Sequence, residues 1–175
     1  IYSDGPIFCR YPRGEGEGVD ITDIVQDVKI GKGRIIKTGK DLAILALGTR
    51  VGSALKVAYH LLQYNLNITV ADARFAKPID TQLVEKLWNE HQKLIIIEEG
   101  SAGGFSSHCL HFLSSKDLLN KHDKEIKCLT MPDNFQDHAS QKEQLAKAGL
   151  DADGLMKVVS KMIFLSNTKN RTIAN

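Results

Sequence analysis

Two arginines close to the start of the chain have the spacing that points most directly to chemistry. They are Arg10 and Arg13, in the sequence Arg-Tyr-Pro-Arg-Gly. Pro12 fixes its own φ and biases Tyr11 toward extended geometry, so both arginines lie on a stiff segment. Guanidinium groups held in this way can bind a phosphate through two parallel hydrogen bonds. The same spacing fits two solvated charges at the edge of a domain, and spacing alone leaves both interpretations open.

The stretch from Glu98 to Gly104, which reads Glu-Glu-Gly-Ser-Ala-Gly-Gly, is the second candidate. Ligands of open α/β sheets gather where strands end, which makes the two carboxylates candidate catalytic groups. Neighbouring strand residues point to opposite faces, however, so Glu98 and Glu99 are not expected to share a proton, and a structural or interface role is favoured. The glycines could cradle a phosphate at a helix N-terminus, but they match neither a Walker loop nor a dinucleotide fingerprint. Packing and tight turning explain them.

Two further groupings resemble known sites only by residue type. His108, Cys109 and His111 are metal-ligating residue types, but their spacing does not place all three on one helix face. We therefore expect Cys109 in the core and the two histidines at its rim. The sequence Gly-Phe-Ser-Ser-His at 104–108 is similar to the turn that carries a hydrolase nucleophile, but it lacks the closing glycine.

The pattern of apolar residues predicts strands that alternate with helices. Continuous or β-branched apolar runs predict strands at 28–30, 34–37, 42–47, 67–73, 94–99 and 126–131, and the run at 94–99 is expected in the middle of the sheet. Helical spacing predicts helices after Gly48, after Asp80 or Thr81, after Gly104, after Ser140 and over 155–163. The fold class is therefore α/β, a three-layer, mostly parallel (mixed) sheet with helices on both faces.

Composition limits the classes of partner. The chain has 175 residues, 42% hydrophobic and 25% charged, with a formal net charge of +2. Its lysines and arginines are scattered, so nucleic acid is not an expected partner. A membrane partner is not expected either, because no apolar run approaches the roughly 20 residues that cross a bilayer. Cys9, Cys109 and Cys128 lie far apart and are odd in number, which indicates reduced thiols and an intracellular protein.

Several segments together resemble one enzyme family, in order and with compatible spacing. The chain is similar, up to about Ile163, to the C-terminal portion of 1-deoxy-D-xylulose-5-phosphate synthases, which are thiamine-diphosphate enzymes of the transketolase-like group. The motifs Arg-Tyr-Pro-Arg-Gly and Arg-Phe-x-Lys-Pro-Ile-Asp make the resemblance most specific. The matching segments are 5–14, 30–33, 42–49, 70–80, 98–104 and 145–151.

The resemblance implies a domain organisation. Residues 1–14 would end a preceding pyrimidine-binding domain, 15–27 would be a linker, and 28–165 would form a transketolase C-terminal-like domain. Residues 166–175 are expected to be a disordered tail. The chain would then be a fragment of a longer enzyme.

It also implies a reaction. Enzymes of this family condense pyruvate with glyceraldehyde 3-phosphate, with loss of CO2, and their product feeds isoprenoid, thiamine and pyridoxal synthesis. Arg13, with Arg10 as the alternative, would hold the aldehyde's phosphate. Thiamine diphosphate and Mg2+ would be bound by upstream domains of a homodimer, so we expect this chain to supply no catalytic, cofactor or metal ligand and to be inactive alone.

Two alternatives stay open. The chain could be the C-terminal domain of a 2-oxo acid dehydrogenase β subunit or of another transketolase relative, although such a protein gives no reason for Arg-Tyr-Pro-Arg-Gly. It could also be a non-catalytic α/β interaction module. The family resemblance implies a bacterial cytoplasm or a plastid, and residues 114–125 carry no chemical signal.

Overall fold

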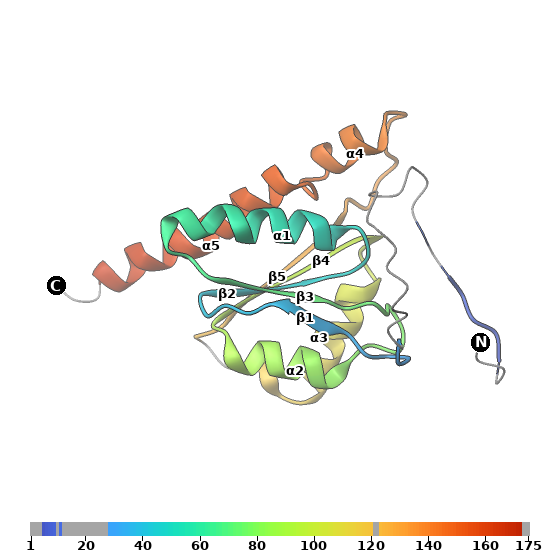
Figure 1. Cartoon of the computed structure of the whole chain (residues 1–175), viewed down its shortest axis with the longest axis horizontal. Coiled ribbons are helices and arrows are strands. Elements are labelled where there is room, and N and C mark those ends of the chain that lie inside the picture. The colour runs from blue at the N-terminus through green and yellow to red at the C-terminus, as the bar shows by residue number, and fades with distance from the viewer. Residues whose placement is uncertain (1–4, 10, 12–27, 121–122, 173–175) are drawn as a thin grey trace, which may run out of the picture.

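The computed structural model describes residues 5–9, 11, 28–120 and 123–172. Five strands form one sheet in the order β1-β3-β2-β4-β5 (Figure 1). Neighbouring strands are parallel except for β1, which runs antiparallel to β3. The strands are β1 (Arg34–Lys37), β2 (Leu42–Ala46), β3 (Ile68–Asp72), β4 (Lys93–Ser101) and β5 (Glu125–Met131).

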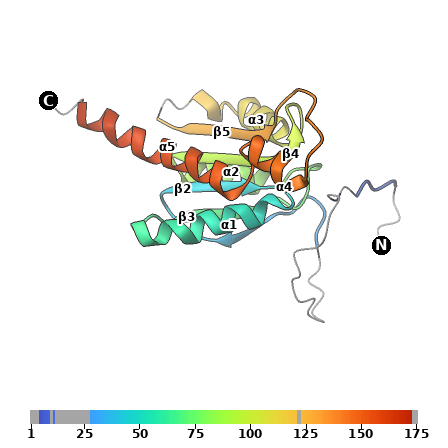
Figure 2. The same cartoon turned by 90° about the horizontal axis from the view of Figure 1, so that it is seen from above.

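Helices cover both faces of the sheet, which confirms the predicted mixed α/β architecture. Helices α1 and α5 pack on one face, and α2 and α3 pack on the other (Figure 1). Seen from above, α5 extends past the end of the sheet (Figure 2). The helices are α1 (Arg50–Leu61), α2 (Thr81–Glu90), α3 (Phe105–Ser115), α4 (Gln141–Lys147) and α5 (Ala152–Thr172), with short 3-10 helices at Leu62–Tyr64 and Leu118–Asn120.

The most apolar strands lie inside the sheet. All five residues of β2 are buried, and so are the four residues from Leu94 to Ile97 in β4. Alternate residues of each strand enter opposite cores: Ile44 packs with α1 and α5, whereas Leu45 packs with α2 and α3. Strand β4 lies inside the sheet, between β2 and β5, as expected, but the central strand is β2, which has two strands on each side. No described helix is long and apolar enough to cross a membrane.

Side-chain caps fix where two helices begin, as the sequence predicted. Asp80 is the N-cap of α2: its Oδ1 accepts a hydrogen bond from Leu83 N at 3.1 Å, and its Oδ2 accepts one from Gly33 N at 3.1 Å. Ser140 and Glu143 form a complete capping box at the start of α4. Asp80 therefore joins a helix start to the turn before β1, whereas Ser140 stabilises only its own helix.

Two predicted boundaries differ from the structure. Residues 28–30, expected to be a strand, lead into a turn in which Lys32 N donates to Lys29 O at 3.1 Å. The chain turns there because Gly31 has a φ of +69°, which a glycine adopts without strain. The tail expected from Ser166 overlaps α5, which continues through Thr172. Residues 10, 12–27 and 173–175 lie outside the described part of the chain, so the proposed linker and the first domain boundary stay predictions.

The two caps give a prediction. Asp80→Ala should lower the free energy of unfolding by about 2 kcal/mol, because two backbone N–H groups lose their acceptor. Ser140→Ala should cost about 1 kcal/mol, since one helix start is affected. Urea denaturation of both variants measures the difference, and an equal or smaller loss for Asp80→Ala would contradict the cross-link to Gly33.

Candidate functional site

The carboxyl ends of β2 and β4 meet at the point where ligands of open α/β sheets usually bind. Strand β2 leads into α1 on one face, and the neighbouring strand β4 leads into α3 on the opposite face. The two connections leave the sheet toward opposite faces, and in such folds this opens a crevice between the two strand ends. We call this place the switch point. The residues that reach this point are Thr49 and Arg50 after β2, and Glu98 and Glu99 in β4.

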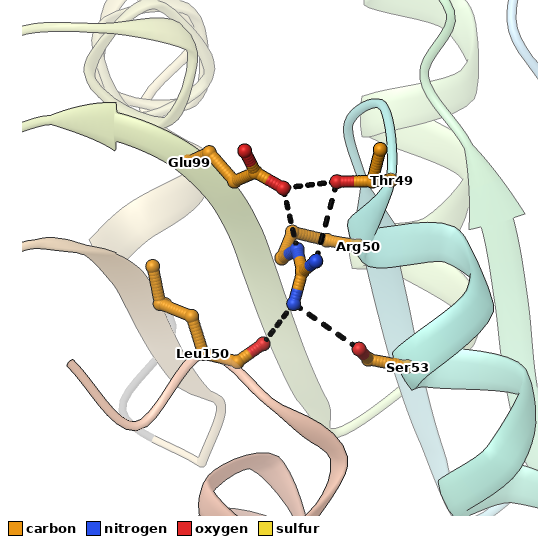
Figure 3. A network of polar contacts seen from close by, with 5 residues as sticks. All are labelled: Thr49, Arg50, Ser53, Glu99 and Leu150. Atoms are coloured by element: carbon orange, nitrogen blue, oxygen red, sulfur yellow. Dashed lines mark hydrogen bonds and ion pairs between the residues drawn. The ribbon is translucent and has the colours of Figure 1, made fainter. Parts of the chain in front are cut away.

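Arg50 fills one side of the switch point (Figure 3). Its Nε donates to Glu99 Oε1 at 3.0 Å, and its Nη1 donates to Leu150 O at 2.6 Å and to Ser53 Oγ at 3.2 Å. Its Nη2 donates to Thr49 Oγ1 at 3.2 Å, and the Thr49 hydroxyl donates to the same Glu99 oxygen. The Arg50 residue is only 7% exposed.

This network links three segments that are far apart in the sequence. Arg50 begins α1, Glu99 lies in β4, and Leu150 lies in the turn between α4 and α5. Four of the five guanidinium N–H groups already have an acceptor within the protein, and the residue is buried, so the group is poorly placed to bind a substrate anion. We therefore read the Arg50 network as a structural cross-link.

Glu98 fills the other side. It is 3% exposed, and its carboxylate accepts hydrogen bonds from Phe105 N at 3.1 Å and from Ser106 N at 2.7 Å, in the first turn of α3. The N-terminus of a helix favours a negative charge, and here the protein supplies that charge itself. Because Glu98 bonds to α3 while Glu99 bonds to Arg50 of α1, the two carboxylates face opposite sides of the sheet, as predicted.

The glycine-rich loop is shaped by Glu98. A Cβ added at Gly100 would lie 2.5 Å from Glu98 Oε2, and one added at Gly104 would lie 2.7 Å from the same oxygen. A side chain at either position would displace the carboxylate. The anion that this loop surrounds is therefore the protein's own Glu98, which accounts for the glycines without an external phosphate.

The residues of α3 are placed as expected. Cys109 is fully buried, whereas His108 and His111 are exposed. Burial first, and then the neighbouring Cys128 and Glu98, raise the pKa of the Cys109 thiol to about 12. No group of three metal-ligating side chains occurs among the described residues. Cys109 is thus a core residue that stays protonated near neutral pH.

The serine of the hydrolase-like turn is also a core residue. Ser106 is 2% exposed, and its side chain bonds to Cys128. Burial raises the pKa of Cys128, although the hydrogen bond from Ser106 opposes the shift. A buried serine with a thiol neighbour lacks the base that would activate a nucleophile.

A shallow hollow of about 310 Å³ lies at the opposite edge of the sheet, where β2 and β3 begin. It is lined by Thr38, Gly39, Lys40 and Asn67. The backbone of this hollow is already paired, since Lys40 N and Asp41 N both donate to Asn67 O at 3.0 Å. The hollow therefore lies where the turn before β2 contacts the turn before β3, and these backbone groups already bond to each other.

The predicted phosphate-binding residues, Arg10 and Arg13, lie outside the described residues. Their role stays a prediction from the sequence. Sequence reasoning missed Arg50, although one signal was present. An arginine at the first position of a helix opposes the helix dipole, which indicates that a specific acceptor holds it there.

The Arg50 network predicts a large loss of stability on truncation. Arg50→Met should lower the free energy of unfolding by about 3 kcal/mol, because Glu99 loses its cationic partner and the Leu150 carbonyl loses its guanidinium donor. Arg34→Met is the matched control: Arg34 also pairs with a carboxylate, but its side chain is 50% exposed, so its loss should cost less than about 1 kcal/mol. Denaturant titration compares the two, and equal losses would refute the cross-link.

Comparisons with known proteins agree with this fold. The model of the family described as "Transketolase, C-terminal domain" matches residues 31–155. A solved structure titled "Split gene transketolase, inactive beta4 tetramer" is similar, with 28% sequence identity and a TM-score of 0.68. The similarity covers 79% of this chain and 44% of that chain, so this chain spans less than half of that relative. Since the family match extends over the sheet and both sides of the switch point, the chain belongs to the transketolase C-terminal domain family.

Proposed function

We propose that this chain works as the C-terminal part of a 1-deoxy-D-xylulose-5-phosphate synthase. Membership of the transketolase C-terminal domain family supports a thiamine-diphosphate enzyme as the parent. The choice of this synthase rests on the Arg-Tyr-Pro-Arg-Gly motif at Arg10 to Gly14 and on the Arg-Phe-x-Lys-Pro-Ile-Asp motif that ends at Asp80. The substrates would be pyruvate and glyceraldehyde 3-phosphate.

One observation supports the proposal that this domain is a scaffold and that the rest of the enzyme holds the catalytic groups. The switch-point crevice, where an open α/β sheet would bind a ligand, is filled by the Arg50–Glu99 pair and by the Glu98 cap. A domain that closes its own ligand crevice is suited to act as a scaffold. Its role would be to hold the homodimer together and to position the upstream domains.

The cofactors are assigned to those upstream domains. Thiamine diphosphate is held in such enzymes through its diphosphate and a divalent cation. The described residues contain no group of three metal-ligating side chains, and the sequence has no Gly-Asp-Gly segment followed by the asparagine typical of thiamine enzymes. These residues do not fit the cofactor, and the catalytic groups would lie in the upstream domains.

The proposed role of this chain in the reaction is to bind the phosphate group of the substrate. Arg13, with Arg10 as the alternative, would donate two parallel hydrogen bonds to the phosphate of the aldehyde. Such a contact orients the carbonyl without taking part in bond formation. The enzyme would act in a bacterial cytoplasm or a plastid.

A second candidate is a transketolase or a 2-oxo acid dehydrogenase β subunit. The solved relative favours it, since that protein is titled a split-gene transketolase. Such a protein would share the sheet but would not require paired arginines around Pro12. The substrate acted on by the full-length enzyme separates the two candidates. A freestanding interaction module would act on neither substrate.

The phosphate anchor predicts a selective kinetic defect. In the full-length enzyme, Arg13→Ala should raise the KM for glyceraldehyde 3-phosphate by a factor of about ten or more, because a charge-assisted hydrogen bond is lost. The KM for pyruvate, which has no phosphate, should change little. Steady-state kinetics with each substrate varied in turn measures both, and Arg10→Ala tests the alternative residue. Equal effects on the two substrates would remove the assignment.

The assignment of the cofactor predicts that this chain alone does not bind thiamine diphosphate. Calorimetric titration with thiamine diphosphate and Mg2+ should give no binding heat beyond dilution. The full-length enzyme, titrated in parallel, is the positive control. Saturable binding by the 175-residue chain would place cofactor ligands within it.

A further inference from the structure

Two arginines at the carboxyl edge of the sheet have no role in the proposed function. They are Arg34, the first residue of β1, and Arg74, which follows β3 and begins the Arg-Phe-x-Lys-Pro-Ile-Asp motif. Two other positions of the motif are accounted for, because Asp80 caps α2 and Pro78 packs on Gly31. Arg74 has no comparable explanation.

Both arginines converge on one carboxylate. Arg34 and Asp72 are opposite each other in the antiparallel pair of β1 and β3, at the sheet edge shown in Figure 1. Asp72 Oδ2 lies 3.4 Å from Arg34 Nε and 3.8 Å from Arg74 Nε. Asp72 Oδ1 accepts a hydrogen bond from Arg74 N at 3.0 Å. Two guanidinium groups therefore share a single negative charge, which leaves the cluster with a net positive charge.

Asp72 orients these guanidinium groups but does not satisfy them. Both Nε distances are longer than a charge-assisted hydrogen bond, which is about 2.7 to 2.9 Å. Within the described ranges, neither guanidinium makes a hydrogen bond, in contrast to Arg50, which makes four. No buried side-chain nitrogen or oxygen lacks a partner in the part of the chain that the structure describes. The free N–H groups of Arg34 and Arg74 thus reach the surface, where a ligand can approach them.

The backbone holds Arg74 in a fixed position. Its φ is +57°, a left-handed conformation that is uncommon for a residue other than glycine and tends to occur at ligand clamps. Its side chain is 19% exposed, so most of the rotamer freedom is already lost before binding.

We propose that Arg34 and Arg74 form a binding site for an oxyanion of the phosphate class. Each planar guanidinium presents parallel N–H donors that match the oxygen spacing of a phosphate. Asp72 holds the two groups near each other and limits their mutual repulsion. The site lies at the end of β3, with Arg34 half exposed, whereas Arg50 and Glu98 lie at the ends of β2 and β4.

Inorganic phosphate is the probe. The full chain, labelled with 15N at arginine, is titrated with sodium phosphate at constant ionic strength and pH, and the arginine Nε–H signals are followed by NMR. Sodium chloride at equal ionic strength is the control for screening. The Arg34 and Arg74 signals should move saturably with phosphate and little with chloride, while the Arg50 signal stays in place.

Variants test which groups bind. Arg34→Met and Arg74→Met should each weaken phosphate binding by a factor of about ten or more, because a charge-assisted contact is lost. Arg74→Lys keeps the positive charge but loses the paired, parallel N–H donors of the guanidinium, so this variant should also bind phosphate more weakly. Lys86→Met, an exposed lysine paired with Glu90 on α2, is the matched control and should bind as the parent chain does.

Two results would overturn the site. One is a set of shifts that are linear in phosphate and equal to those with chloride. The other is unchanged affinity for phosphate in both Arg34→Met and Arg74→Lys. These two variants test the site even if Arg74→Met does not fold. The experiment measures binding and not catalysis, so its outcome is independent of the proposed reaction.

Discussion

The structure depends on a buried arginine whose hydrogen bonds are all made inside the protein. Arg50 lies where β2 turns into α1, and it joins Glu99 of β4 to the carbonyl of Leu150, a residue 100 positions later in the chain. Taking a guanidinium out of water is costly unless each donor finds an acceptor. Four of the five N–H groups find acceptors, and they do so only when the sheet, α1 and the turn between α4 and α5 are all in place. The network therefore couples the parts of the domain to one another.

Glu98 imposes a similar constraint on the opposite face. Its carboxylate occupies the N-terminus of α3, and the absence of side chains at Gly100 and Gly104 makes room for it. A pattern that resembles a phosphate loop is in this way explained by an internal anion. Glycines next to a helix start are weak evidence for a ligand when an acidic residue precedes them in the strand.

The sequence was most informative where a pattern is local. The apolar runs that became β2 and β4, the N-cap at Asp80 and the capping box at Ser140 all depend on residues close together in the chain, and the structure contains each of them. The order of the strands depends on which runs pair: β4 lies inside the sheet between two parallel strands, as expected, but the central strand of the five is β2. Arg50 was missed because its partners lie 49 and 100 residues away. The family was indicated by motifs, whereas the role of Arg13 rests on sequence alone.

The direction of β1 has a consequence for assembly. Because β1 runs against its neighbour, its first residue lies at the carboxyl edge of β3, and polypeptide joined ahead of it is delivered to that edge. In the parent enzyme that we propose, a domain attached ahead of β1 would be held at a high effective concentration at this edge. The contact between the two domains would then need only a small interface, and the tether would buffer mutations that weaken it.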